Sequence, residues 1–122
     1  MPLNPGYLAA VGDAKTRVKE ITVDEYRTLT SSGTNHLLVD VREDNEWAAG
    51  HAKGAVHIGK GILDRDIESK VPDKSTRLVL YCGGGFRSAL AGDAIQKMGY
   101  TQVLSLAGGW KDWQAAGMPV EK

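Results

Sequence analysis

One stretch of the chain, residues 78–98, joins an apolar run, three consecutive glycines and a helical pattern without interruption. The apolar run from Leu78 to Tyr81 predicts a short buried strand. The segment from Ser88 to Met98 predicts a helix, because apolar residues recur at about 3.6-residue spacing and Gly99 follows as a C-terminal cap. Cys82, the one cysteine of the chain, lies between these two elements. A strand, a glycine turn and a helix N-terminus form an arrangement in which proteins bind anions through backbone N–H groups.

The loop itself reads Cys82-Gly83-Gly84-Gly85-Phe86-Arg87-Ser88, and its composition suits an ionised thiol. The helix N-terminus and Arg87 both favour the thiolate over the thiol. The glycines permit the positive φ angles of a tight turn and leave the N–H groups uncovered, so that these can form a preorganised anion hole. The alternative is a buried, unreactive cysteine followed by a flexible turn, since a lone cysteine is often only a small apolar residue.

The size and charge of the chain restrict its class. Its 122 residues predict one domain with its own core. Formal net charge is zero, with 15 basic and 15 acidic residues, so we expect neither nucleic acid nor an anionic membrane as the main partner. A single cysteine excludes an internal disulfide and a cysteine-rich zinc site. The absence of a secretory signal pattern and of a long apolar span leads us to expect a cytoplasmic protein.

Short apolar strands alternate with helical segments along the chain. We interpret residues 1–17 as an N-terminal extension, in which Leu8, Val11 and Ala14 predict a short helix, and residues 18–122 as the domain. Thr22 to Glu25 is a capping-box pattern that begins a helix. Strands are expected at 18–21, 36–41, 55–58, 78–81 and 103–106, with helices within 22–33, 44–49, 59–72, 88–98 and 108–117.

This alternation predicts an α/β fold in which helices cover both faces of a parallel sheet. Ligands of such sheets bind beyond the C-terminal ends of the strands. Cys82 follows one such end. Three other strands are followed by Asp40, by the Gly59 region and by residues 107–109. We therefore expect these segments to line one rim.

Three stretches together resemble the single-domain rhodanese (thiosulfate sulfurtransferase) family. The first is Val39-Asp40-Val41-Arg42-Glu43 with Glu46-Trp47, Gly50-His51, Gly54-Ala55 and His57, which is similar to the family's N-terminal motif. The second is the Cys82–Arg87 loop, and the third is Ala107-Gly108-Gly109-Trp110, similar to the C-terminal motif. The likeness covers about residues 18–120. The chain departs from the family pattern at Ala52, where Ile or Leu is usual, and at Gly59, where Pro is frequent.

The resemblance implies a three-layer sandwich around a mostly parallel five-stranded sheet. It also implies a sulfur relay, in which Cys82 takes the outer sulfur of thiosulfate as a persulfide and passes it to a thiophilic acceptor. Cyanide is the assay acceptor, and a cellular thiol or a sulfur-relay protein is the expected natural one. No cofactor is implied. Residues 83–88 would bind the anion, with Phe86 as a wall of the pocket and Ser88 as a helix cap.

Structural roles are predicted for several polar residues of the N-terminal motif. Asp40 and Arg42 have the composition of a catalytic pair, but we expect Arg42 to pair with Glu46 or Glu43 and to hold the loop after its strand. His51 and His57 are expected to be hydrogen-bonded structural histidines, since the spacing does not suit a metal site. Three tryptophans, Trp47, Trp110 and Trp113, are expected in the core.

Lys60 is a further candidate, at the rim of the pocket. In rhodanese-like folds the segment after His57 borders the pocket, and a cation there would attract thiosulfate. The alternative is a solvated surface lysine.

Other functions remain as alternatives to the sulfurtransferase. One is a persulfide carrier that serves a protein partner and has little thiosulfate activity. Another is a non-catalytic interaction domain, although such domains commonly lack the cysteine. A cysteine-based phosphatase or arsenate enzyme is disfavoured by loop length, because phosphatases of this type need C-x5-R and this chain has C-x4-R between Cys82 and Arg87.

Overall fold

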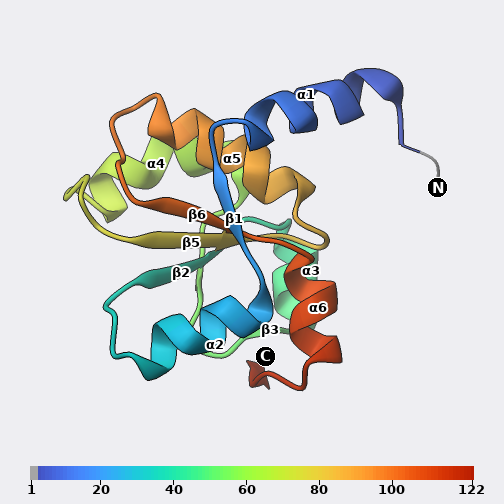
Figure 1. Ribbon diagram of the computed structural model, residues 1–122, viewed down its shortest axis with the longest axis vertical. Helices are drawn as coiled ribbons and strands as arrows, with labels where there is room; N and C mark the ends of the chain where they lie inside the picture. The colour runs from blue at the N-terminus through green and yellow to red at the C-terminus, as the bar shows by residue number, and fades with distance from the viewer. Residues whose placement is uncertain (1–2) are drawn as a thin grey trace.

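Five short strands form a parallel sheet at the centre of the computed structural model, which describes residues 3–122 (Figure 1). The strand order is β1-β6-β5-β2-β4, so β5, which precedes the cysteine loop, lies in the middle. Every neighbouring pair in this sheet is parallel. The bounds of its strands are β1 Lys19–Ile21, β2 Leu37–Asp40, β4 Val56–His57, β5 Leu78–Tyr81 and β6 Val103–Leu106.

Helices cover both faces of the sheet, which confirms the predicted α/β sandwich (Figure 1). The longer helices α1, α4 and α5 lie on one face, and α2 and α6 lie on the other. Among residues 3–122, no helix has the length and apolar character that a membrane crossing requires. The bounds of the helices are α1 Pro5–Lys15, α2 Val23–Ser31, α3 Asp44–Ala49, α4 Lys60–Lys70, α5 Phe86–Gln96 and α6 Gly109–Ala115.

Local sequence signals account for where helix α2 begins. The Thr22 hydroxyl accepts a hydrogen bond from the Glu25 N–H at 3.1 Å, and the Glu25 carboxylate accepts one from the Thr22 N–H at 2.9 Å. This is the predicted capping box, which satisfies two of the backbone donors that a helix start leaves unpaired.

The sheet separates two apolar cores. On the α4 and α5 side, alternate residues of the central strands, Leu78 and Leu80 among them, pack with Leu63, Ile67 and Ile95. On the α2 and α6 side, the other residues of the same strands pack with residues such as Tyr26 and Trp113. Strand β5 is buried on both faces, as the continuous apolar run from Leu78 to Tyr81 predicts.

The N-terminal extension forms helix α1, which packs on α5. The short helix was predicted; Val11 and Ala14 are buried in it, whereas Leu8 is 44% exposed and faces solvent. Arg17, two residues after the end of α1, joins the two helices through Asp93 of α5, with Nε 2.7 Å from Oδ1. The other end of α1 lies near the start of α5, where the rings of Tyr7 and Phe86 are 6.2 Å apart. Residues 1 and 2 lie outside the described part of the chain.

A second, two-stranded sheet was not predicted. Strand β3, His51–Ala52, pairs antiparallel with β7, Val120–Glu121, near the C-terminus. Each of these strands has two residues, too few for an alternating pattern to be recognised in the sequence.

Candidate functional site

Cys82 lies where the central strand β5 ends, in the turn that leads to α5. The helix begins at Phe86, two residues earlier than predicted, because Gly85 is its N-cap with a left-handed φ of +97°. Ser88 is therefore not the cap that the sequence suggested but the third residue of the helix. The positive φ angle explains the need for glycine at position 85, since other residues adopt it at a cost.

The Cys82 sulfur receives hydrogen bonds from the turn that surrounds it. The Gly85 N–H lies 3.1 Å and the Ser88 N–H 3.4 Å from Sγ. The Ser88 hydroxyl oxygen is 3.5 Å from the same sulfur. The cysteine is buried, with 1% of its surface exposed. Donors gathered around one buried sulfur stabilise negative charge there.

Ser105 is a further residue near the Cys82 sulfur, and it was not among the predicted site residues. Its hydroxyl oxygen is 2.7 Å from that of Ser88, and both residues are fully buried. Ser105 belongs to β6, which places it beside Leu80 of β5. The available signal was a serine inside the otherwise apolar strand Val103-Leu104-Ser105-Leu106, since a buried hydroxyl needs a partner.

The first turn of α6 binds the carbonyl groups of the cysteine loop. The Trp110 N–H donates to the Cys82 carbonyl at 2.7 Å, and the Lys111 N–H donates to the Gly83 carbonyl at 3.1 Å. In a trans peptide the C=O and the following N–H point in opposite directions, so the N–H groups of Gly83 and Gly84 point away from α6. Neither of these two N–H groups has a hydrogen-bond partner in the described part of the chain.

Close approach of backbones explains the glycines of the C-terminal motif. Gly109 has a φ of +47°, and a Cβ there would collide with the Cys82 carbonyl. Gly108, the N-cap of α6, has a φ of +74°, and its N–H is 3.3 Å from where a Cβ on Gly85 would lie. The cysteine loop and the start of α6 are thus packed backbone against backbone.

Arg87 lies beside the loop and pairs with Glu46 of α3. Its Nη1 is 2.7 Å from Oε1 and its Nη2 is 3.1 Å from Oε2. The hydrogen bonds from Arg87 lower the pKa of Glu46 to about 2, against the opposing effect of burial. The same hydrogen bonds raise the pKa of Arg87, with a further contribution from the charge of Cys82. Both groups are therefore charged at neutral pH.

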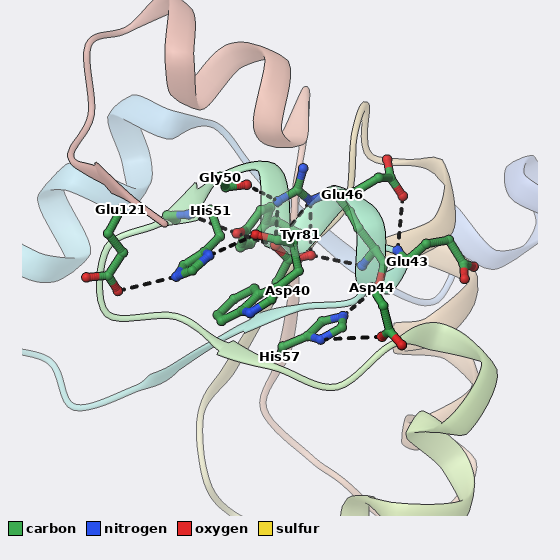
Figure 2. A network of polar contacts seen from close by, with 12 residues as sticks. Asp40, Glu43, Asp44, Glu46, Gly50, His51, His57, Tyr81 and Glu121 are labelled. Carbon is green, nitrogen blue, oxygen red and sulfur yellow. Dashed lines mark hydrogen bonds and ion pairs between the residues drawn. The ribbon is translucent and has the colours of Figure 1, made fainter.

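Asp40 and Arg42 form a buried ion pair at the end of β2 (Figure 2). The Arg42 Nη2 is 2.8 Å from Asp40 Oδ2, which corrects the prediction that Arg42 pairs with Glu46 or Glu43. Asp40 is fully buried, and a buried carboxylate needs a cation beside it, which Arg42 supplies. Glu46, on α3, pairs with Arg87 instead. The Tyr81 hydroxyl donates to Asp40 Oδ2 at 2.6 Å.

The Asp40 carboxylate raises the pKa of both Arg42 and Tyr81, which share it. Burial alone lowers the pKa of Arg42, but its hydrogen bonds to Asp40 raise that pKa above the ordinary value. Burial, together with the hydrogen bond to Asp40, raises the pKa of Tyr81. The Tyr81 hydroxyl also accepts the Ala52 N–H at 3.0 Å, and the Arg42 Nη2 donates to the Gly50 carbonyl at 2.8 Å. The network therefore joins β2 and β5 to the segment after α3.

The two histidines of the N-terminal motif flank a tryptophan. The ring of His51 stacks on Trp47 with centroids 3.4 Å apart, and His57 stacks on Trp47 with centroids 5.0 Å apart. His57 Nε2 is 2.8 Å from the Arg42 carbonyl oxygen, and His51 Nδ1 is 3.1 Å from that of Trp47. Figure 2 shows His57 directed toward Asp44 and His51 directed toward Glu121. Trp47 is half-buried in this stack.

The remaining candidates lie at the margins of the site. Phe86 is half-buried beside Tyr7, with the Lys15 ammonium 5.0 Å from its ring centre. Lys60 is exposed as the first residue of α4, and its backbone N–H donates to Val41. Its place at the pocket rim stays a prediction. Across residues 3–122, no cluster of three or more His, Cys, Asp or Glu side chains is arranged as a metal site.

The comparison with protein families agrees with this architecture. The model of the rhodanese-like domain matches residues 22–116. The chain belongs to the rhodanese-like domain family. The fold of the family, a parallel five-stranded sheet between helices, is the one described above.

Two curated relatives are sulfurtransferases by name. The chain is 37% identical over 100 residues to the probable adenylyltransferase/sulfurtransferase MoeZ of Mycobacterium tuberculosis; this match covers 81% of the chain but 25% of MoeZ. It is 36% identical over 74 residues to the thiosulfate sulfurtransferase PspE of Escherichia coli, covering 61% of the chain and 70% of PspE. The chain thus spans about a quarter of MoeZ.

A solved structure is similar along nearly the whole chain. It is RPA3614 from Rhodopseudomonas palustris, described as a protein of unknown function and possible tyrosine phosphatase. The two chains share 29% identity and a TM-score of 0.85, with 99% of this chain and 98% of that one covered. Because this alignment extends beyond residues 22–116, it includes the N-terminal extension.

Proposed function

We propose that this chain is a sulfurtransferase in which Cys82 carries sulfur from thiosulfate to a thiophilic acceptor. The observation that carries the proposal is the arrangement of donors around Sγ. Two N–H groups, from Gly85 and Ser88, donate to the sulfur, and those of Gly83 and Gly84 have no partner among the described residues. Such a loop is suited both to a thiolate and to a second anion brought to it.

The proposed reaction consists of two displacements at sulfur. The Cys82 thiolate attacks the outer sulfur of thiosulfate, forming a new S–S bond. The S–S bond within thiosulfate breaks, and its electron pair leaves with sulfite. The Cys82 persulfide then gives its outer sulfur to cyanide or to a thiolate, and the electron pair of that bond returns to Cys82. This sequence predicts ping-pong kinetics.

The surrounding residues have defined tasks in this reaction. Arg87 attracts the thiosulfate dianion, and Glu46 holds the guanidinium by its two-point contact. Phe86 forms a wall, and Lys60 adds positive charge at the rim. Sulfite is a good leaving group, so no general acid is required. Each step moves only an electron pair between sulfur and its partner, so the chemistry requires no cofactor.

A protein donor is the second candidate for the source of sulfur. In MoeZ, the matching residues form a quarter of a longer protein named for adenylyl and sulfur transfer. That observation favours a relay in which the persulfide arrives from, or leaves to, another protein. A reducing compartment such as the cytoplasm would keep the single thiol available for either donor.

The cysteine loop does not suit a tyrosine phosphatase, the activity suggested for the similar structure RPA3614. The loop from Cys82 to Arg87 is one residue shorter than the C-x5-R loop that surrounds a tetrahedral phosphate.

Mass spectrometry of the intact protein after thiosulfate treatment tests the proposal. A gain of about 32 Da, one sulfur atom held as a covalent intermediate, should map to Cys82 and disappear on addition of cyanide with release of thiocyanate. The Cys82→Ser variant should show neither. If the adduct forms only with a persulfide donor and never with thiosulfate, the relay is correct; if it forms with neither, the chain is not a sulfurtransferase.

A further inference from the structure

Arg77 is the arginine of this chain that has no carboxylate partner within residues 3–122. The other arginines each pair with an aspartate or a glutamate, namely Arg17, Arg27, Arg42, Arg65 and Arg87. The half-buried Arg77 contacts the uncharged side chain of Gln102 instead, with Nε 3.2 Å and Nη2 2.9 Å from Oε1. The positive charge of Arg77 is therefore not balanced by an ion pair.

The Gln102 amide is itself held in one orientation. Its Nε2 donates to the Ser75 carbonyl at 2.7 Å, so its oxygen faces Arg77. This oxygen occupies the edge of the guanidinium formed by Nε–H and one N–H of Nη2. The second edge, formed by Nη1 and the other N–H of Nη2, has no partner in the described part of the chain. Two parallel N–H groups of this kind suit two-point hydrogen bonding to a carboxylate or a phosphate.

Strand register brings a second cation to the same place. Arg77 directly precedes β5, Lys19 begins β1, and β6 lies between these two strands. Leu78 is paired with Val103 and Lys19 with Leu104, so Arg77 and Lys19 flank the start of β6 from its two sides. Both residues line one cavity of about 320 Å³.

The charged residues that line this cavity are all cations. They are Arg17, Lys19 and Arg77, and no aspartate or glutamate among residues 3–122 lines it. Arg17 is balanced by Asp13 and Asp93, which leaves Lys19 and Arg77 as the uncompensated cations. The chain as a whole carries no net charge, so this local excess does not arise from a generally basic surface.

We propose that this cavity binds a small oxyanion, a molecule with a phosphate or carboxylate group, through the free edge of Arg77. Lys19 supplies further positive charge. Arg77 and Cys82 lie at opposite ends of β5, so the bound anion does not occupy the sulfur site. The site goes beyond the proposed function and does not depend on it, because no step of sulfur transfer takes place there.

Titration of the isotope-labelled full chain with inorganic phosphate, followed through its backbone amide NMR signals, tests the proposal. The ionic strength is held constant with chloride. The signals of Lys19, Arg77 and Gln102 should shift together and saturate with one Kd. Shifts confined to residues 83–87 would place phosphate at the sulfur site, and shifts that do not saturate would indicate general screening of charge. Either result overturns the proposal.

An isosteric substitution tests the importance of the missing counterion. Gln102→Glu places a carboxylate against Arg77, so the Kd for phosphate should rise at least about tenfold. Gln114→Glu makes the same change at an exposed position of α6 and should keep the wild-type Kd. Arg77→Lys keeps the charge but loses the parallel N–H groups, so it too should raise the Kd severalfold.

An unchanged Kd in Gln102→Glu or in Arg77→Lys, or an equal rise in Gln114→Glu, would contradict the proposal. No sulfur donor or acceptor takes part in the titration, so it gives an answer whatever the result of thiosulfate treatment.

Discussion

Arg87 and Glu46, 41 residues apart in the chain, face each other in a two-point ion pair that joins the cysteine loop to α3. Their N–O distances are 2.7 Å and 3.1 Å. The Arg87 guanidinium is therefore oriented before any substrate arrives, although the Glu46 carboxylate neutralises part of its charge. If Arg87 binds the anion, as proposed, the charge left by this pair sets how strongly the site attracts thiosulfate.

Replacing Arg87 with alanine should weaken the use of thiosulfate more than the intrinsic reactivity of Cys82. We expect kcat/KM for thiosulfate to fall at least about tenfold, or about 1.4 kcal/mol of transition-state stabilisation. Alkylation by uncharged iodoacetamide should change much less. Arg65→Ala, which removes an exposed arginine of α4, should leave both rates unchanged. Equal losses in both reactions of Arg87→Ala would show that the arginine does not contact the anion.

Gly83 and Gly84 should differ sharply in their tolerance of a side chain. A Cβ on Gly83 would lie 3.0 Å from the Arg87 Nη2, whereas one on Gly84 would meet nothing within 4 Å. Gly83→Ala should therefore displace the guanidinium and raise the KM for thiosulfate severalfold. Gly84→Ala, the matched control, should keep the wild-type KM. Steady-state kinetics of the two variants decide the matter, and a KM raised equally in both would contradict this account of the loop.

Tyr81→Phe should destabilise the protein by about 1.5–3 kcal/mol, because it removes a buried hydrogen bond to the charged Asp40. Tyr26→Phe is the comparison, because the Tyr26 hydroxyl is hydrogen-bonded to the ring of His36 and not to a carboxylate. We expect this variant to lose about 0.5–1.5 kcal/mol of unfolding free energy. Denaturant unfolding measures both values. A smaller loss in Tyr81→Phe than in Tyr26→Phe would mean that the Asp40 network contributes little to stability.

The attachment of α1 should weaken in acid. The hydrogen bonds from Arg17 lower the pKa of Asp93 to about 2, from an ordinary value of 3.8. A carboxylate whose pKa is lower in the folded state adds stability that is fully present above the ordinary value and is lost as the pH falls toward the lowered one. The stability difference between wild type and Asp93→Asn should thus be constant near neutrality and shrink from about pH 3.8 to pH 2.

Unfolding free energies measured across that pH range test this expectation. Asp64→Asn, which removes an exposed carboxylate of α4, is the control for the loss of one negative charge. Added salt should also reduce the Asp93 difference, because Arg17 is partly exposed and its charge is screened. A difference that grows on acidification would exclude the ion pair as its cause.

Local patterns were sufficient to predict most elements of the fold. The run from Leu78 to Tyr81 is apolar throughout because β5 is buried on both faces, and this is visible without knowing its neighbours. The capping box at Thr22 involves residues three positions apart, so it too is visible in the sequence. The start of α5 was misplaced by two residues, because a left-handed glycine cap at Gly85 resembles any other glycine of a loop.

Sequence alone placed the thiol at the end of a central strand and at the start of a helix, because strand and helix patterns depend on neighbours within a few positions. It did not decide which groups meet across the molecule. The Arg87–Glu46 pair, the Arg42–Asp40 pair and the Ser88–Ser105 contact depend on strand order and on the packing of α3 against the loop. The same holds for α6, whose N–H groups bind the Cys82 and Gly83 carbonyls. These partners are chosen by register and distance in the folded chain, which no local pattern records.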